Sequence, residues 1–260
     1  MENTQKKSGA GRVGILDEIR GFAIICMVVY HAMYDLKYIF GLDVPVFFES
    51  WFDVIRDIFA GMFIFISGTV CRYSSSNIKR GAQCFLIGMM MTFIMPFFTS
   101  GTIMFGILHF LGISMILFGL GQKLFDLLPS WVGIAASILL FVLTMNVQLT
   151  YVSGVPATGY IGIPGLFQLH LPMRAYNVGV LFPLGLHDAS FASSDYFPML
   201  PWFFLFIAGS YFGIIARGGR LPKFCYPTHI RWLATVGRYT IWIYVLHQPV
   251  LYLIFSLIFH

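Results

Sequence analysis

Charge is what this sequence has least of. Only 10% of its 260 residues are Asp, Glu, Lys or Arg, whereas a soluble domain carries about 25%. So few charges cannot cover the surface of a soluble domain of this size, and a soluble enzyme is excluded. Disorder is excluded as well, because 58% of the residues are hydrophobic and 28 are Phe. The composition predicts an all-α polytopic membrane protein.

Cysteine is also scarce, with four residues at positions 26, 71, 84 and 225. None forms a CxxC pair, and no His lies at a metal-ligand spacing from any of them, so we expect core residues or free thiols and no metal. The sequence has no GxGxxG or Walker loop, which leaves a nucleotide-hydrolysing enzyme without support. The net charge of +5 is typical of cytoplasmic loops in a membrane protein, so we expect no nucleic-acid partner.

Long apolar runs predict seven full membrane spans. They cover residues 16–40, 51–71, 82–98, 103–120, 131–149, 197–216 and 232–259, and a span needs about 20 apolar residues. The segment 175–196 holds VGVLFPLGL, which is too short to cross and is interrupted by Pro and Gly. A full crossing there would place the basic stretch ARGGRLPK outside, so we expect a re-entrant segment on the outer side.

The basic residues predict the orientation. Of the 16 Lys and Arg residues, all except Lys37, Arg56 and Arg174 fall on the side of the N-terminus in this topology, while most acidic residues lie toward the other side. Because positive residues orient membrane proteins toward the cytoplasm, we expect residues 1–14 to be a cytoplasmic tail. Residues 15–260 are expected to form a single transmembrane domain.

The first span carries a polar stripe. Arg20 and His31 are eleven positions apart, which places them on one helix face about 16 Å apart along the axis. Asp35 follows His31 at i+4 on the same face. A carboxylate beside an imidazole fixes its tautomer and prepares a general base, so we predict catalytic roles for His31 and Asp35. The alternative is that these are interfacial residues whose charged ends reach the water.

Two further histidines fall at a similar depth. His109 lies in the fourth predicted span and His247 in the last one. A single His inside a bundle is usually a hydrogen-bonded core residue, but three at one level suggest a shared site. We therefore treat His109 and His247 as supporting residues, with a structural role as the alternative.

Four polar residues near the outer side are candidates for substrate binding. Arg56 and Asp57 share one helical turn at the outer mouth, where they could form a structural clamp or a polar-substrate site. His187 and Asp195 lie within the interrupted segment, where a broken helix would open a cavity. Aromatic side chains in that segment could stack on a sugar ring or belong to the interfacial aromatic belt.

The loop RYSSSNIKRG joins the second and third spans on the basic side. Orientation alone explains the charges of Arg72, Lys79 and Arg80. The competing interpretation is a phosphate site at the start of the third span, where helix N–H groups and basic side chains favour anions. On that interpretation Arg72, Asn77, Lys79 and Arg80, together with Arg20, bind a phosphorylated cofactor.

Several segments together point to a family. LDEIRGFAIICMVVYHAMYDL resembles the opening of the transmembrane acyltransferases related to the catalytic domain of heparan-alpha-glucosaminide N-acetyltransferase, including their bacterial members. FIFISGTVCRYSSSNIKRG, ILHFLGIS, SSDYFPMLPWFFLFIAG and YVLHQPV resemble further blocks of that family. The resemblance implies transfer from acetyl-CoA or another acyl-CoA, with His31 at the active site. It covers most of the chain.

The resulting hypothesis is an integral-membrane acyltransferase of the bacterial inner membrane. Acyl-CoA would bind at the cytoplasmic face, and the acceptor would be a hydroxyl or amine of a polar, glycan-like molecule on the outer face. The chain has no large soluble lumenal domain, which favours a bacterial cell-surface glycan over heparan. A proton-coupled transporter of a small polar solute is the alternative, because intramembrane His and Asp also form proton relays. A structural membrane subunit is a third interpretation, and homo-oligomerisation is left open.

Overall fold

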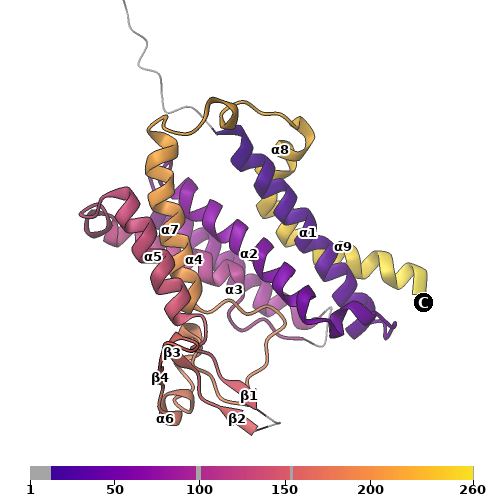
Figure 1. The fold of residues 1–260 in the computed structure, drawn as a ribbon. Coiled ribbons are helices and arrows are strands. Elements are labelled where there is room, and N and C mark those ends of the chain that lie inside the picture. Colours follow the sequence, from indigo (N-terminus) through magenta and orange to yellow (C-terminus); the bar gives the residue numbers. More distant parts are fainter. Residues whose placement is uncertain (1–12, 98–100, 153–154, 260) are drawn as a thin grey trace, which may run out of the picture.

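The computed structural model describes residues 13–97, 101–152 and 155–259, and most of them are helical (Figure 1). The helices are α1 (Gly14–Tyr38), α2 (Ser50–Cys71), α3 (Asn77–Ile94), α4 (Ile107–Phe125), α5 (Ser130–Thr144), α6 (Met173–Tyr176), α7 (Met199–Arg217), α8 (Arg231–Arg238) and α9 (Thr240–Phe259). Short 3₁₀ turns lie at Pro45–Phe48, Met95–Phe97, Phe182–Leu184 and Lys223–Cys225.

The prediction of a mostly helical membrane protein is confirmed, but the count of seven spans is not. Among the described residues, five helices are long and apolar enough to cross a membrane: Trp51–Cys71, Asn77–Phe97, Ile107–Phe125, Met199–Arg217 and Thr240–Phe259. Helix α1 has 25 residues but carries several charged side chains, and the apolar helix α5 has only 15.

The chain is not all-α, and this corrects the predicted fold class. The run predicted over residues 131–149 ends as a helix at Thr144. Two antiparallel hairpins follow, β1 (Thr150–Val152) with β2 (Val155–Ala157), and β3 (Tyr160–Ile163) with β4 (Phe167–His170). In the second hairpin, Gly165 has φ of +79° in the turn, a conformation that favours glycine.

The predicted re-entrant segment is mainly irregular. Between α6 and α7 the chain forms only the 3₁₀ turn Phe182–Leu184, so a helix that dips into the membrane is not confirmed. The last predicted span is also divided, because α8 ends at Arg238 and α9 begins at Thr240.

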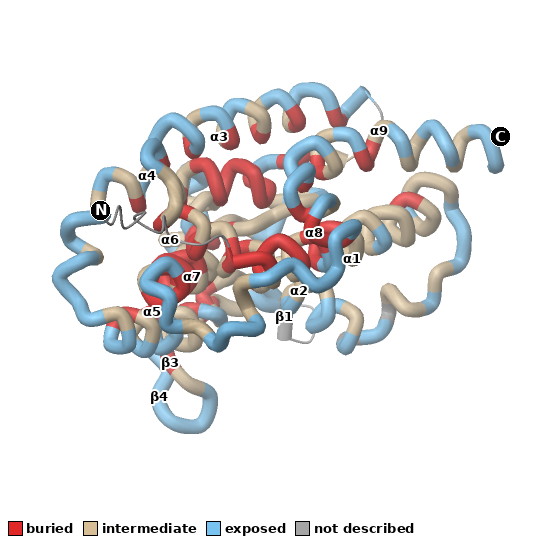
Figure 2. Tube along the Cα trace, turned by 90° about the horizontal axis from the view of Figure 1, so that it is seen from above, coloured by how far each residue is buried: buried red, intermediate tan, exposed pale blue. Residues whose placement is uncertain are grey.

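Close helix pairs hold the bundle together: α2 packs on α7, α3 on α4, α5 on α7 and α1 on α8. Glycine lets the backbones of α2 and α7 approach, since a Cβ on Gly68 would lie 1.9 Å from the carbonyl oxygen of Phe206. Small residues have this role in membrane helix pairs. Figure 2 shows that the buried residues concentrate on the middle helices α1, α4 and α7, whereas α9 projects outward with mostly exposed residues near its C-terminus.

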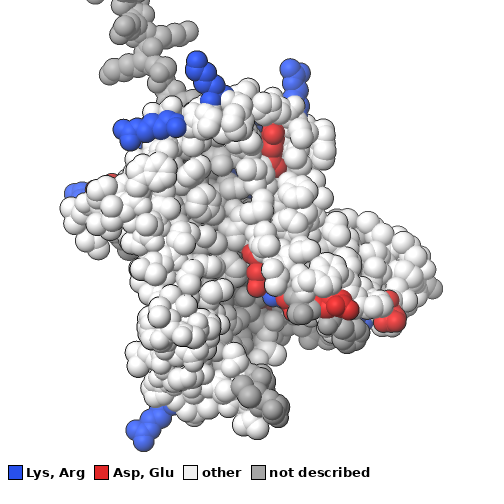
Figure 3. Space-filling view, in the orientation of Figure 1, with Lys and Arg blue, Asp and Glu red and all other residues white. Residues whose placement is uncertain are grey.

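The two ends of the bundle differ in charge (Figure 3). We call the end where α1 and α3 begin and α7 ends the basic end. It includes the described residues Lys79, Arg80, Lys123, Arg217, Arg220, Lys223, Arg231 and Arg238. Asp43, Glu49, Asp53 and Asp57 lie where α1 ends and α2 begins, at what we call the acidic end.

Candidate functional site

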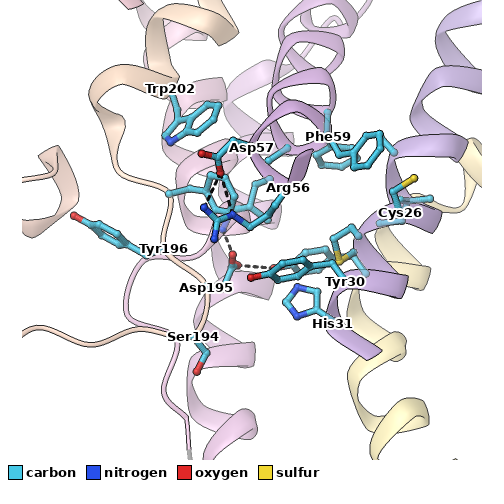
Figure 4. A pocket seen from close by; sticks show the side chains of 18 of the residues that line it. Cys26, Tyr30, His31, Arg56, Asp57, Phe59, Ser194, Asp195, Tyr196 and Trp202 are labelled. Atoms are coloured by element: carbon cyan, nitrogen blue, oxygen red, sulfur yellow. Dashed lines mark hydrogen bonds and ion pairs between the residues drawn. The ribbon is translucent and has the colours of Figure 1, made fainter. Parts of the chain in front are cut away.

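A cavity of about 310 Å³ with both polar and apolar walls lies among α1, α2, α7, α9 and the segment before α7. Its walls include Tyr30, His31, Arg56, Asp57, Ser194, Asp195, Tyr196, Trp202 and Tyr244. Figure 4 shows the side chains of Tyr30, His31, Arg56 and Asp195 gathered around one space. The structure therefore brings four predicted residues together: His31, Arg56, Asp57 and Asp195.

A second, smaller cavity of about 90 Å³ adjoins the first. His31, Ser194, Asp195 and Tyr244 line both cavities, and His247 lines the smaller one. His31 is thus the imidazole that faces both spaces. A group in this position can contact a molecule in either cavity.

The imidazoles of His31 and His247 lie side by side, with ring centroids 5.0 Å apart. Nδ1 of His247 is 2.6 Å from the carbonyl oxygen of Tyr244. A carbonyl only accepts hydrogen bonds, so Nδ1 carries the proton and donates it. The Nε2 atom of His247 is buried without a hydrogen-bond partner in the described part of the chain.

Asp35 is fully buried and is bonded to α9 instead of to His31. Its Oδ1 accepts a hydrogen bond from Nε2 of Gln248 at 2.6 Å. Within residues 13–97, 101–152 and 155–259, no hydrogen bond joins Asp35 to His31. The predicted pairing within one helix is therefore corrected, because the side chain of Asp35 turns toward the neighbouring helix α9.

Asp195 fixes the segment before α7 onto the bundle. Its Oδ2 accepts hydrogen bonds from the N–H of Ile107 at 3.0 Å and from the hydroxyl of Tyr244 at 2.9 Å. Burial raises the pKa of the Asp195 carboxyl, and these two bonds act to lower it. Gly106 permits the close approach, since a Cβ there would lie 2.4 Å from Oδ2. The carboxylate also benefits from its place at the N-terminus of α4.

Arg56 is held at the cavity wall by two carboxylates. Its Nε lies 3.0 Å from Asp57 and its Nη1 lies 2.9 Å from Asp53. The guanidinium also lies 6.0 Å from the ring centroid of Tyr30, within the range of a cation–π contact. The predicted clamp is present, and Arg56 and Asp57 also line the cavity.

His187 and His109 are not among the residues that line these two cavities. His187 stacks on Phe191 with ring centroids 4.6 Å apart. His109 is buried between the rings of Phe85 and Phe105, and its Nε2 lies 3.4 Å from the hydroxyl of Thr92. Both contacts are typical of packing roles.

Three of the predicted cofactor residues form bonds within the protein. Arg20 pairs with Asp17 at 3.3 Å. Asn77 donates to the carbonyl oxygen of Cys71 at 3.0 Å. Arg72 is buried and bonds to Ser210 and Asp126.

Arg72 joins three segments at the basic end. Its Nε donates to the carbonyl oxygen of Ser210 at 3.0 Å, and its Nη1 pairs with Asp126. The guanidinium lies 4.8 Å from the ring centroid of Phe118. These contacts describe a structural clamp, whereas Lys79 and Arg80 are exposed on the first turn of α3.

The sequence did not identify Tyr30, Tyr244, Gln248 or Trp202 as site residues. A signal was present for two of them: Tyr244, His247 and Gln248 recur at i, i+3 and i+4 in the apolar helix α9, which places them on one face. Tyr30 and Trp202 are single aromatic residues in aromatic-rich spans, so nothing local distinguishes them.

A comparison with known protein families decides the relationship. The model of the heparan-alpha-glucosaminide N-acetyltransferase catalytic family matches residues 12–249. The chain belongs to this family. The match covers nearly the whole chain and includes every cavity residue named above, which confirms the predicted resemblance. No curated protein and no solved structure matched the chain.

Within the described ranges, no group of three or more His, Cys, Asp or Glu side chains is placed to hold a metal ion.

Proposed function

We propose that the protein is an integral-membrane acyltransferase that moves an acyl group, most simply acetyl, from acyl-CoA to a hydroxyl or amine of a polar, glycan-like acceptor. Membership of the acetyltransferase family supports the reaction class. The observation that carries the proposal is that His31 faces two adjoining cavities. Donor and acceptor can meet at one imidazole in that arrangement.

The reaction needs one basic nitrogen. In direct transfer, the acceptor oxygen or nitrogen attacks the thioester carbonyl while His31 takes its proton. The carbon–sulfur bond then breaks, and the proton returns to the leaving thiolate. A positioned general base contributes about 10²–10⁴-fold to such a rate. Alternatively, His31 attacks the thioester carbonyl, the carbon–sulfur bond breaks, and the thiolate leaves with the imidazole proton. The acyl-imidazole then passes the acyl group to the acceptor, whose proton returns to the imidazole.

The remaining cavity residues suit a polar acceptor. Asp57 and Asp195 can accept hydrogen bonds from hydroxyl groups, and Arg56 can stabilise the negative oxygen that develops on the carbonyl. Tyr196 and Trp202 present aromatic rings to the same cavity, where a sugar could stack. His187 does not line the cavity, but its ring contacts Tyr196, which does.

The donor is placed at the basic end, which we propose faces the cytoplasm. Lys79 and Arg80 are exposed at the N-terminus of α3, where helix N–H groups also favour phosphate. Acyl-CoA would bind from this side, and the acceptor would approach His31 from the other side. The N-terminus is then cytoplasmic, as in a protein of the bacterial inner membrane.

Purified protein in lipid nanodiscs with radiolabelled acetyl-CoA tests the proposal. We expect thioester cleavage, or label on the protein, that depends on His31. Proton-coupled solute flux in liposomes without thioester cleavage would contradict an acyltransferase and support the transporter hypothesis.

A further inference from the structure

An apolar groove of about 940 Å³ lies on the bundle face between α1, α2, α5 and α7. Figure 3 shows this face hollowed between α7 and α1. Its lining is almost entirely apolar and includes Ile15, Ile19, Val54, Ile58, Met62, Phe65, Ile66, Phe141, Met145, Leu205, Phe212 and Leu221. In a membrane-spanning bundle this face borders hydrocarbon chains.

The groove is continuous with the cavity of the candidate site. Asp57, Gln148 and Trp202 line both the groove and the cavity that contains His31. These three side chains form the boundary between the groove and the cavity, and Trp202 contributes to the wall of each. A molecule in the groove therefore lies next to the cavity that His31 lines.

The polarity of the groove changes abruptly along its length. Between Ile66 and Asp57 its α2 wall is apolar over nine positions, or about 14 Å. One leaflet of a membrane has about 15 Å of hydrocarbon, half of the usual 30 Å core. The polar residue of this wall, Asp57, lies near the acidic end, and apolar Val54 follows it one turn further on. An apolar channel of leaflet length that ends at polar groups matches a hydrocarbon chain with a polar head.

We propose that the groove holds the hydrocarbon chain of a membrane amphiphile and that the polar head of this amphiphile is the acyl acceptor. This inference rests on the proposed function and names its acceptor class. A lipid in the leaflet at the acidic end has its head at the level of Asp57 and its hydrocarbon chain directed toward the basic end. The groove has the same order, with its polar residues near the acidic end and its apolar wall toward the basic end. We assign the hydrocarbon chain to the acceptor, because an acetyl group on the donor has no hydrocarbon chain.

The transfer balances without a further reactant. A hydroxyl or amine of the head enters the cavity past Trp202 and attacks the thioester carbonyl. Its proton passes through His31 to the thiolate that leaves when the carbon–sulfur bond breaks. The products are the acylated amphiphile and the free thiol of CoA.

A quenching experiment tests occupancy of the groove without relying on activity. The protein keeps Trp202 as its single tryptophan, with Trp51, Trp131, Trp232 and Trp242 changed to Phe, in nanodiscs of a phospholipid brominated on its chains. We expect bromine to quench Trp202. Ile58→Phe should relieve the quenching, because Ile58 lies one turn before Gly61, whose added Cβ would lie 3.5 Å from the Trp202 ring.

The matched control is Ile55→Phe. Ile55 is exposed on the same helix but is not among the groove residues. It should leave the quenching of Trp202 unchanged. If Trp202 is quenched to the same extent in Ile58→Phe and Ile55→Phe, only ordinary boundary lipid contacts this face and the proposal is wrong. If Trp202 is not quenched at all, no lipid chain occupies the groove and the proposal is wrong as well.

A second experiment tests the acceptor class. Membranes that contain the protein are incubated with radiolabelled acetyl-CoA and extracted with organic solvent. We expect the label in the lipid fraction, reduced by Ile58→Phe and unchanged by Ile55→Phe. Label only in water-soluble products would overturn this inference and leave the acyltransferase intact. An absence of both transfer and thioester cleavage would overturn the proposed function itself.

Discussion

The two halves of α1 use their polar residues in opposite ways. In the first half, Glu18 is buried and accepts hydrogen bonds from the backbone N–H groups of His229 and Ile230. In the second half, His31 faces two cavities, and its neighbour Asp35 has one oxygen bonded by Gln248 and one buried oxygen without a partner in the described residues.

The difference separates structural from functional polarity. Buried polar groups normally have hydrogen-bond partners, and leaving one without a partner costs about 1–3 kcal/mol. Glu18 meets this requirement and thereby holds the segment before α8 against α1. The polar groups around His31 meet it only in part, because Oδ2 of Asp35 and Nε2 of His247 have no partner within the described residues.

The largest expected effect follows from His31→Ala. Removing the imidazole that faces both cavities should lower turnover by about 10²–10⁴-fold, the usual contribution of a general base. The melting temperature should change little, because no hydrogen bond of His31 within the described residues is lost. Radiolabelled acetyl-CoA turnover and thermal unfolding measure the two quantities.

His109→Ala is the control for that experiment. His109 is packed between aromatic rings, so its loss should lower the melting temperature and retain turnover per folded molecule. Near-normal turnover in His31→Ala would show that His31 is neither the general base nor the nucleophile, and the proposed mechanism would be wrong.

The next effect tests the first half of α1. Glu18→Ala should destabilise the protein by about 1.5–3 kcal/mol, the range for hydrogen bonds to a charged group, because two N–H groups lose their acceptor. Glu18→Gln keeps an acceptor oxygen and should lose less. Chemical unfolding measures the stability, and turnover per folded molecule should stay close to that of the unchanged protein. A loss of turnover without a loss of stability would contradict the structural role.

The apolar runs predicted the helices well where the sequence signal is local. The second span was predicted over residues 51–71, and α2 covers Ser50–Cys71. The prediction failed after Thr144, where an apolar run continues into strands. Strand pairing depends on contacts between Tyr160–Ile163 and Phe167–His170, which apolar content alone does not show.

The site was predictable only in part for the same physical reason. His31 stood out because an ionisable group inside a span faces the bundle interior. Its surroundings depend on the packing of α1 against α9, which brings Gln248 to Asp35 across 213 positions of sequence. His109 and His247 were equivalent in the sequence, and only the packing separates them.

The basic end shows a similar contrast between a buried cation and exposed ones. Arg72 is buried in a clamp, whereas Lys79 and Arg80 are exposed one turn into α3. Changing Lys79 and Arg80 together to Gln should weaken acyl-CoA binding about tenfold, because charged hydrogen bonds to phosphate contribute at least this much. Equilibrium binding of acetyl-CoA measures the effect.

The matched control changes Arg220 and Lys223, another Arg and Lys pair exposed at the basic end, to Gln. It should leave the affinity for acetyl-CoA nearly unchanged. Equal losses in both double variants would show that only the overall charge of this end matters. If neither double variant loses affinity for acetyl-CoA, the charges of the loop RYSSSNIKRG serve only to orient the protein in the membrane.

The smallest expected effect concerns Asp35. In Asp35→Asn, the side-chain oxygen can still accept the hydrogen bond from Gln248, so the packing of α1 against α9 is kept. We expect a loss of turnover of only a few-fold, far below that of His31→Ala, because Asp35 lies next to His31 and no hydrogen bond joins the two in the described residues.

Gln248→Ala should lower the stability of the protein more than Asp35→Asn does, since it leaves a buried carboxylate without its donor. The two changes share one bond, so their effects should not add in the double variant. If Asp35→Asn alone lowers turnover as far as His31→Ala does, Asp35 acts directly on the imidazole, and the second half of α1 contains a catalytic pair rather than one reactive residue.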